Sequence, residues 1–542
     1  MPKAYLLHHL VLGAAERAAG TPALTAAGSS MTYGELGSSM RAFSWGLMAL
    51  GLGRSQRVAV YLEKRVETVV ACFGACAAGG VFVPINPVLK AGQVAHILRD
   101  CAVQVLVTSA ERLAGLRSAL PQCTALRHIV LVNEPRKAGD CAAPEQVAVH
   151  GWSELLDAAP GAVHNVVDGD MAAILYTSGS TGLPKGVVLS HRNMVTGAKS
   201  VAQYLENEPD DTLLAALPLS FDAGFSQLTT AFHSGARVVL LNHLFPRDVL
   251  AALAAERVTG LTAVPPLWIQ LAQLDWPPGI ADHLRYIANT GGAMPRSTLQ
   301  RLRAMLPGTK TYLMYGLTEA FRATYLPPEE VERRPDSIGK AIPNCEVLVL
   351  RDDGTPCAPG ETGELVQRGP LVSLGYWNDP ERTRERFKPL PPQSGCREAG
   401  LVLEEIAVFS GDLVRMDAEG YLYFVGRRDE MMKTSGYRVS PTEVEEILYA
   451  TGLIAECVAF GVPHDTLGQA ICVVATPRPG SDVSVAALRA ACQAAMPQYM
   501  VPKCIELSET GLPRNQNGKI DRTAVAGAWR ARYPQGVARE SA

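Results

Sequence analysis

The sequence has 542 residues, too many for one ordinary hydrophobic core, and its 47% hydrophobic and 19% charged residues are typical of a soluble globular enzyme. The formal net charge of −3 gives no electrostatic case for a nucleic acid or an anionic membrane as partner. The twelve cysteines form no C-x-x-C pair and no zinc-spaced cluster, which favours reduced thiols in the cytoplasm. No apolar run has the character of a signal peptide or a membrane span.

The pattern over the first half of the chain predicts alternating strands and helices. Short apolar runs bounded by turn residues alternate with stretches whose apolar residues recur at helical spacing. Repeated βα units indicate parallel sheets with helices on both faces. The expected strands are 55–64, 81–87, 103–110, 212–220, 237–243 and 259–266, and the expected helices are 65–80, 91–101, 225–236 and 245–258.

The predicted secondary structure changes in type twice in the rest of the chain. From about Ile338 short strands are joined by glycine-rich turns. From Asp429 a small unit follows, whose first amphipathic helix begins with Ser440 as cap and Pro441 in the first turn. The sequence therefore predicts an α/β fold with a large N-terminal domain of βαβ-wound sheets plus a β-rich subdomain (1–428), and a small, mobile α+β C-terminal domain (429–542).

A run rich in glycine, serine and threonine lies between two apolar strands, 171–176 and 186–189. Its backbone N–H groups and hydroxyls can donate hydrogen bonds to the oxygens of a polyanion. It is not a Walker A loop, because Pro184 precedes Lys185 where that motif has a glycine. Taken alone, the run could be an ordinary turn. As a phosphate loop, its members are Thr177, Ser178, Gly179, Ser180, Thr181, Gly182 and Lys185.

Three later segments carry further polar side chains. "YGLTEA", from Tyr315, places a hydroxyl next to the carboxylate of Glu319. Asp412 stands before a hairpin that ends at Arg427, and "LPRNQNGKIDR" presents Lys519 after a glycine on a polar loop. Each of these residues would alone be read as an ordinary surface or core side chain.

Together and in this order, the four segments resemble the AMP-forming adenylating superfamily of acyl-CoA synthetases, luciferases and adenylation domains of peptide synthetases. The resemblance extends from "TPALTAAGSSMTYGEL" to "GKIDR". Within the superfamily, the chain looks most like the AMP-forming acyl-CoA ligases associated with bacterial exosortase A systems. The segments that carry this finer resemblance are "LPLSFDAGFSQL", "YGLTEAFRATYLPPEEVERRPDSIGKAIPN" and "VLKAGQVAHILRDCAVQVLVTSAERL".

The resemblance implies an ATP-dependent acid–thiol ligase that uses Mg²⁺. The superfamily activates a carboxylate by attack on the α-phosphorus of ATP, which gives an acyl-adenylate and pyrophosphate, and a thiol then displaces AMP. The first step brings two anions together, so positioned cations and hydrogen-bond donors are the main requirement. The expected acceptor is CoA, and the alternative is an enzyme, possibly amino-acid activating, that loads the phosphopantetheine of a carrier protein. A non-catalytic nucleotide-binding protein would have lesions in the motifs, and the sequence has none.

The resemblance also implies a role for each matching residue. The phosphate loop would hold the β- and γ-phosphates, with Thr181 and Glu319 at the metal. Asp412 would accept hydrogen bonds from both ribose hydroxyls, and Arg427 would reach the ribose or the α-phosphate. Lys519 would bridge the carboxylate and α-phosphate oxygens during adenylation. The remaining nucleotide contacts would come from Tyr315, stacking on adenine, and from Asn289, Gly291, Gly292, Ala293, Gly316 and Thr318.

The second step implies motion of the C-terminal domain. Asp429 matches the hinge about which the small domain rotates. Rotation would withdraw Lys519 and bring Gly436 to line a narrow channel for the thiol arm. Lys433 would then contact the cofactor or the hairpin.

The acyl group is expected where "PLSFDAGF" and "NTGGA" meet, in a pocket with Phe221, Asp222, Asn289, Gly291 and Leu317. Amino-acid-activating domains carry an aspartate in a similar stretch, where it pairs with the substrate's ammonium group. A buried unpaired carboxylate is strongly unfavourable, so either the substrate has an amine or another polar group, or Asp222 caps or pairs inside the protein. The expected partners are a small carboxylic acid and CoA or a carrier protein, and the chain is expected to be a monomer or a homodimer.

Overall fold

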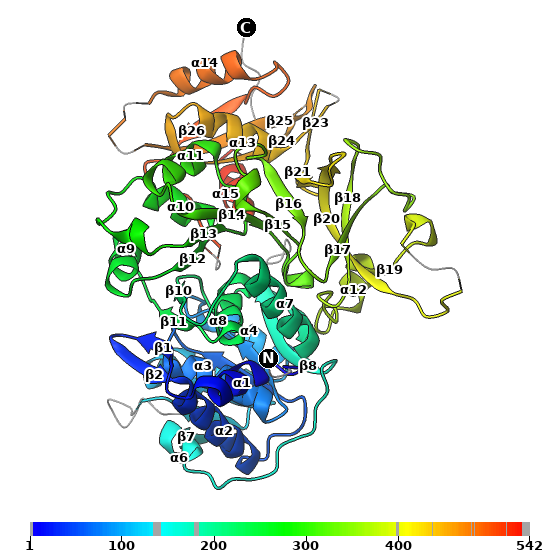
Figure 1. The fold of residues 1–542 in the computed structure, drawn as a ribbon. Helices are drawn as coiled ribbons and strands as arrows, with labels where there is room; N and C mark the ends of the chain where they lie inside the picture. Colours follow the sequence, from blue (N-terminus) through cyan, green and yellow to red (C-terminus); the bar gives the residue numbers. More distant parts are fainter. Residues whose placement is uncertain are drawn as a thin grey trace.

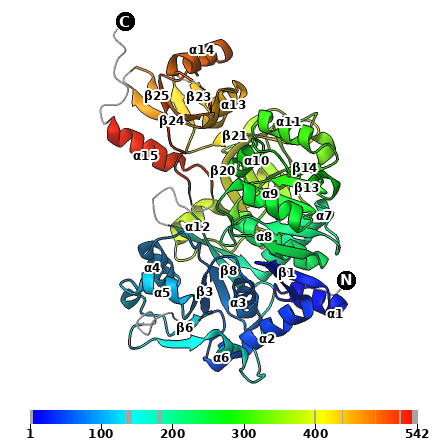
Figure 2. The ribbon, with the colours of Figure 1, turned by 90° about the vertical axis from the view of Figure 1, so that its left-hand side faces the viewer.

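The structure is a computed structural model that describes residues 4–533 except 134–142, 178–183, 397–399, 436, 465, 479, 482 and 516–517. Its sheets and helices form successive layers. Figures 1 and 2 show the N-terminal layer (blue to cyan) at one end, the large sheet (green to yellow) in the middle, and the C-terminal sheet with its helices (orange to red) at the other end. In the described part of the chain, no helix combines the length and the apolar character needed to cross a membrane.

The N-terminal layer contains a seven-stranded sheet. Its strands β3 to β7 and β8 run parallel, and β9 returns antiparallel to β8 at one edge. The central strands are buried on both faces, which explains why they read as continuous apolar runs. In spatial order the strands are β7 (Ala148–Gly151), β6 (His128–Leu131), β5 (Val105–Thr108), β3 (Arg57–Tyr61), β4 (Val81–Pro84), β8 (Met171–Thr177) and β9 (Lys185–Ser190).

The large sheet has fourteen strands and changes character along its width. From β1 to β14 the pairings are parallel, and from β14 onwards they are antiparallel. The wound part and the β-rich part therefore share one continuous sheet. In spatial order the strands are β17 (Glu346–Leu350), β18 (Thr362–Arg368), β20 (Ile406–Met416), β21 (Leu422–Arg427), β16 (Ser337–Ala341), β15 (Thr324–Leu326), β14 (Lys310–Tyr315), β13 (Tyr286–Asn289), β12 (Gly260–Ala263), β10 (Thr212–Ala215), β11 (Arg237–Leu240), β1 (Pro22–Ala26) and β2 (Ser29–Thr32), with β19 (Phe387–Pro389) paired to β20.

The helices fill the space between the two sheets and cover their outer faces. One core joins both sheets through α1 (His9–Ala18), α2 (Tyr33–Ala49), α3 (Val66–Ala77), α7 (His191–Tyr204) and α8 (Asp222–Ser234). The outer face of the large sheet packs against α9 (Pro246–Ala255), α10 (Pro265–Leu271) and α11 (Arg296–Met305), and that of the smaller sheet against α4 (Ala91–Asp100) and α5 (Ala110–Leu116). The remaining elements of this part are α6 (Trp152–Leu156), α12 (Pro380–Arg386) and the 3₁₀ turns η1 (Leu120–Gln122), η2 (Ile280–Asp282), η3 (Thr318–Ala320), η4 (Pro328–Glu330) and η5 (Pro392–Ser394).

The C-terminal domain has its own five-stranded sheet and its own core. Ser440 occupies the N-cap position of its first helix and Pro441 the first turn, as expected, although the Ser440 hydroxyl makes no capping hydrogen bond. The hydroxyl instead lies close to Gly426, where a Cβ atom would approach it to 3.1 Å. The elements are β22 (Met432–Thr434), β23 (Tyr437–Val439), α13 (Pro441–Ala450), β24 (Ile454–His464), β25 (Gly468–Pro477), α14 (Val485–Ala495), β26 (Cys504–Leu507) and α15 (Arg522–Arg532).

Candidate active site

The two ends of the glycine- and serine-rich run face each other. Thr177 ends β8 and Lys185 begins β9, and the two residues are partners in the antiparallel ladder. The run is therefore the connection of a hairpin at the edge of the seven-stranded sheet. The predicted members Ser178, Gly179, Ser180, Thr181 and Gly182 lie outside the described residues.

The carboxylate of Glu319 is held by two side chains. Lys185 Nζ lies 3.1 Å from Glu319 Oε1, and the Tyr376 hydroxyl donates a hydrogen bond of 2.5 Å to the same oxygen. The Lys185 ammonium also lies 4.3 Å from the centre of the Tyr376 ring. Burial acts to raise the pKa of Glu319, but the ammonium and the hydroxyl outweigh it and hold the pKa below its usual value. Tyr376 was not among the predicted site residues, because nothing in the surrounding "GYW" distinguishes it from a core tyrosine.

Asp412, on β20, lies between an aromatic hydroxyl and a guanidinium. The Tyr315 hydroxyl donates to Asp412 Oδ2, and Arg427 Nη1 lies 3.7 Å from Asp412 Oδ1. Burial raises the pKa of Asp412, and Arg427 opposes the rise. The buried Oδ1 atom has no hydrogen-bond partner among the described residues, so it can accept one from a ligand hydroxyl. The structure thus brings three predicted nucleotide residues together.

The loop before α15 presents Lys519. Gly518 has a φ of +78°, a left-handed conformation that favours glycine and turns the chain toward the cleft. The Lys519 N–H donates to Asn515 Oδ1 at 3.1 Å, and Arg514 Nη1 donates to the Gly518 carbonyl at 3.0 Å. These bonds fix the backbone on both sides of the turn.

The Lys519 ammonium enters the large domain between two predicted pocket residues. It lies 5.4 Å from the centre of the Phe221 ring, and a Cβ atom on Gly291 would lie 2.7 Å from Lys519 Cε. A larger residue would displace the end of this side chain, and the φ of +79° at position 291 favours glycine. Burial lowers the pKa of Lys519, while the carboxylates of Asp222 and Asp412 act to raise it. The cation therefore lies near both the nucleotide residues and the acyl-pocket residues.

Other predicted contacts surround this position. Asn289 ends β13 and donates from Nδ2 to the Gly292 carbonyl at 2.8 Å, and Ala293 follows in the same loop. Gly316 and Leu317 join β14 to η3, in which Thr318 is buried. A Cβ on Gly316 would lie 3.3 Å from Arg322 Cα, so this turn packs closely on the chain that follows it.

Asp222, the first residue of α8, has a partner inside the protein. Arg322 Nη1 lies 3.3 Å from Asp222 Oδ2, and both side chains are 4% exposed. Burial raises the pKa of Asp222, and Arg322 and then Lys519 oppose the rise. Gly224 allows this helix start to pack against the preceding loop, because a Cβ there would lie 1.8 Å from the Pro218 carbonyl oxygen. Of the two expectations for Asp222, the structure bears out the internal pair.

Of the residues predicted for the second step, Lys433 lies away from the site, and Asp429 lies at its edge, bonded to Arg427. Lys433 is exposed on β22, where its backbone N–H donates to Gln469 of the same domain at 2.6 Å. Asp429 is exposed after β21 and accepts a hydrogen bond of 3.2 Å from Arg427 Nε. Gly436 lies outside the described residues.

The site suits Mg²⁺ bound together with phosphates. This cation prefers hard oxygen ligands and is usually held by one or two carboxylates plus substrate phosphates. Glu319 supplies such a carboxylate, with its pKa held low, beside the Lys185 ammonium. Among the described residues, no group of three or more His, Cys, Asp or Glu side chains could hold a metal.

Comparisons with known proteins cover almost the whole chain. The AMP-binding enzyme family matches residues 13–377, and its C-terminal domain family matches residues 443–519. The L-proline--[L-prolyl-carrier protein] ligase of Pseudomonas fluorescens is 31% identical over 535 residues, covering 96% of this chain and 99% of that protein. The long-chain-fatty-acid–CoA ligase of Escherichia coli O157:H7 is 29% identical over 546 residues, covering 93% and 91%. The structure of o-succinylbenzoate CoA synthetase from Bacillus subtilis, in complex with ATP and a magnesium ion, aligns with a TM-score of 0.78 and 25% identity, covering 96% and 99%.

The chain belongs to the AMP-binding enzyme family. It is an AMP-forming ligase of the acyl-CoA synthetase type, as the motifs predicted. The large N-terminal and small C-terminal parts of the fold are likewise confirmed.

Proposed function

We propose that this chain activates a small carboxylic acid as its acyl-adenylate, with Lys519 as the cation of the first step, and then transfers the acyl group to the thiol of CoA. The observation that carries the proposal is the position of the Lys519 ammonium. It is 5.4 Å from the Phe221 ring, beside Gly291, and near both Asp222 and Asp412. The Lys519 ammonium is thus held between the acyl side and the ribose side of the site, with Arg322 and Arg427 also nearby.

The other residues prepare the two anions for reaction. Asp412 offers its unpartnered Oδ1 to a ribose hydroxyl, and Tyr315 holds the carboxylate in place from its other oxygen. Lys185 and Glu319 face the phosphates, and Thr181 is the hydroxyl expected to join them. Magnesium bound at Glu319 would supply Lewis-acid stabilisation of phosphate charge. The Lys519 ammonium would donate to a carboxylate oxygen of the acid and to an α-phosphate oxygen, which offsets their mutual repulsion.

Thioester formation requires the cleft to change. Lys519 fills the space beside Gly291, so the thiol has to approach after this side chain leaves. Rotation of the C-terminal domain about Asp429 would remove Lys519 and bring Gly436 and Lys433 to the cleft. Loading of a carrier-protein phosphopantetheine is the second candidate, favoured by the likeness to the prolyl-carrier-protein ligase.

The test separates the two half-reactions. Adenylation is measured as ATP–pyrophosphate exchange, and transfer as thioester formation from supplied acyl-AMP and CoA or carrier protein. Lys519→Ala should lower exchange by about a hundredfold or more, which is typical of the loss of one positioned charge in a reaction cleft, and should leave transfer largely intact. Lys503→Ala, which removes an exposed lysine of the same domain, is the matched control and should change neither. Equal loss of both half-reactions in Lys519→Ala would refute the assignment.

A further inference from the structure

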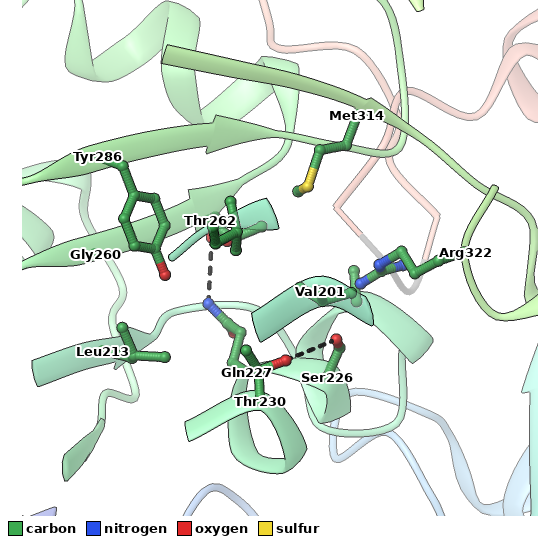
Figure 3. Close-up of a pocket in the computed structure, with 12 residues that line it drawn as sticks. Val201, Leu213, Ser226, Gln227, Thr230, Gly260, Thr262, Tyr286, Met314 and Arg322 are labelled. Atoms are coloured by element: carbon green, nitrogen blue, oxygen red, sulfur yellow. Dashed lines mark hydrogen bonds between the residues drawn. The ribbon is translucent and has the colours of Figure 1, made fainter. Parts of the chain in front are cut away.

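A small hollow lies between the large sheet and helices α7 and α8, with a cavity volume of about 20 Å³, room for little more than one water molecule or one hydroxyl group. Six of the side chains that line it are polar (Figure 3): Ser226, Gln227, Thr230, Thr262, Tyr286 and Arg322. The inner side of a helix that packs on a sheet is normally apolar. The polar lining therefore needs a reason.

Two of these lining residues, Ser226 and Thr230, belong to a polar stripe along α8 that begins at Asp222, outside the lining itself. Asp222, Ser226 and Thr230 follow at intervals of four residues, which places them on one face of the helix, and all three are at most 3% exposed. At about 1.5 Å per residue the stripe is about 12 Å long. It begins beside Phe221 and the Lys519 ammonium and leads into the hollow. If Lys519 marks the carboxylate of the acid, as the proposed function states, the acyl group extends along this stripe.

Three buried atoms around the stripe lack hydrogen-bond partners among the described residues: the acceptors Asp222 Oδ1 and Gln227 Oε1, and the donor Arg322 Nε. In each case the rest of the side chain is engaged. Asp222 Oδ2 pairs with Arg322, and Gln227 Nε2 donates to the carbonyls of Leu214 at 2.8 Å and Thr262 at 3.3 Å. Since buried polar atoms are nearly always paired in proteins, these point to a ligand that pairs them. Two acceptors require a ligand with O–H or N–H donors.

The charges decide between a hydroxyl and an ammonium. Once the substrate carboxylate pairs with Lys519, the remaining pair of Asp222 and Arg322 is neutral. An ammonium group would then enter a buried site without a counter-charge, which is strongly unfavourable. A neutral hydroxyl can donate to Asp222 or Gln227 and accept from Arg322 at no such cost.

The far end of the hollow limits the length of the acyl group. The Tyr286 ring lies across Gly260, where a Cβ would approach its Cζ to 2.4 Å. The Tyr286 hydroxyl is fixed by Asn207 Nδ2 at 3.2 Å. A long alkyl chain would meet this ring and leave the polar atoms of the stripe unpaired.

We infer that the substrate is a short hydroxy acid, whose hydroxyl groups pair with Asp222 and Gln227 of the α8 stripe and with Arg322. The inference rests on the proposed function, because Lys519 defines where the carboxylate lies. It makes Asp222, Gln227 and Arg322 specificity-determining residues.

The test compares acids that differ at one atom. ATP–pyrophosphate exchange is measured with butanoate, 3-hydroxybutanoate and 3-aminobutanoate, with propanoate, lactate and alanine, and with succinate and octanoate. In the four-carbon or the three-carbon series, kcat/KM for the hydroxy acid should be at least tenfold higher than for the unsubstituted acid and for the amino acid. It should also be higher than kcat/KM for succinate and for octanoate. Preference for an unsubstituted acid, an amino acid, succinate or octanoate would overturn the inference but leave the proposed function standing. Absence of exchange with every acid would overturn both.

A double variant provides the reverse test. Asp222→Leu with Arg322→Met replaces the ion pair by apolar side chains of similar size, a change that buried pairs often tolerate. It should lower the preference for the hydroxy acid over the unsubstituted one to less than twofold. Arg237→Met with Glu256→Leu removes an ion pair of 2.7 Å outside the hollow and should keep the wild-type preference. A preserved preference for the hydroxy acid in the first variant would contradict the assignment. Thermal unfolding verifies that each variant is folded. If the first variant does not fold, the acid series measured on the wild-type protein alone tests the inference.

Discussion

Glu446 provides a test of the contact between the two domains. This side chain of α13 is half-buried near Asp336 and Arg296 of the large domain, and Arg296 Nε pairs with Asp336 at 2.5 Å. Burial, and then the Asp336 carboxylate, raise the pKa of Glu446 from 4.5 to about 7, while Arg296 opposes the rise. Glu445, the other acid beside it, is paired with Arg522 at 2.7 Å. The ionised Glu446 therefore disfavours the conformation in which Lys519 lies in the cleft.

The magnitude follows from the pKa. One pKa unit is worth about 1.4 kcal/mol, so a rise from 4.5 to about 7 corresponds to about 3 kcal/mol against the ionised form, and solvent screening makes this an upper bound. A group with a raised pKa binds a proton more readily in this conformation than in one where Glu446 is free. The Lys519-inserted conformation should thus gain stability as the pH falls from 7 toward 4.5, and lose it as the pH rises through 7.

The assay is the pH dependence of adenylate formation between pH 5.5 and 8. Glu446→Gln should raise the rate at pH 7.5, by up to about a hundredfold if the full 3 kcal/mol applies, and should flatten the part of the profile between pH 6 and 8. Glu443→Gln, on the exposed side of the same helix, is the control and should behave like the wild type. An unchanged profile in Glu446→Gln, or an equal change in both variants, would refute the reasoning.

Two other predictions concern the cleft and the stability of the fold. Gly291→Ala should slow adenylate formation, because its Cβ would lie 2.7 Å from Lys519 Cε and the end of this flexible side chain would have to shift from its position. The φ of +79° should cost about 1–2 kcal/mol in unfolding free energy. An unchanged exchange rate in a folded variant would contradict the placement of Lys519. His191 is 1% exposed, and burial lowers its pKa to about 4, so the unfolded state takes up its proton first as the pH falls below 6.5. Its contribution to acid destabilisation should reach about 2 kcal/mol at pH 5. In the wild-type protein the Leu7 N–H donates to His191 Nδ1 at 3.1 Å, and His191→Asn retains an acceptor for it. The variant should therefore show a smaller fall in melting temperature between pH 7 and 5 than the wild type. An equally steep fall would contradict the role of His191 in acid destabilisation.

Much of the fold was predictable because it depends on local patterns. The expected segments 55–64 and 65–80 correspond to β3 and α3, and 225–236 lies within or next to α8, since apolar periodicity reports which face is buried. The continuity of the large sheet could not be seen in this way. The pairing of β16 with β21 joins segments separated by about eighty residues, and only the tertiary structure determines it.

Some residues of the candidate site could likewise be predicted from local sequence, and others could not. Glu319, Asp412 and Lys519 could be named because each stands in a motif at a fixed place in the chain. Arg322 and Tyr376 could not, because their partners are 100 and 57 residues away in sequence and nothing local distinguishes them. Asp222 is an example. The sequence indicated that it pairs either with the substrate or inside the protein, but only the structure identifies Arg322 as its internal partner.

The central claim is that the innermost phosphorus of ATP meets a carboxylic acid in the cleft that Lys519 enters. The most direct measurement is ³¹P nuclear magnetic resonance of the products formed from ATP, Mg²⁺, CoA and the best acid of the series. AMP and pyrophosphate should appear in equal amounts and match the thioester formed. ADP and inorganic phosphate as the products would contradict the account.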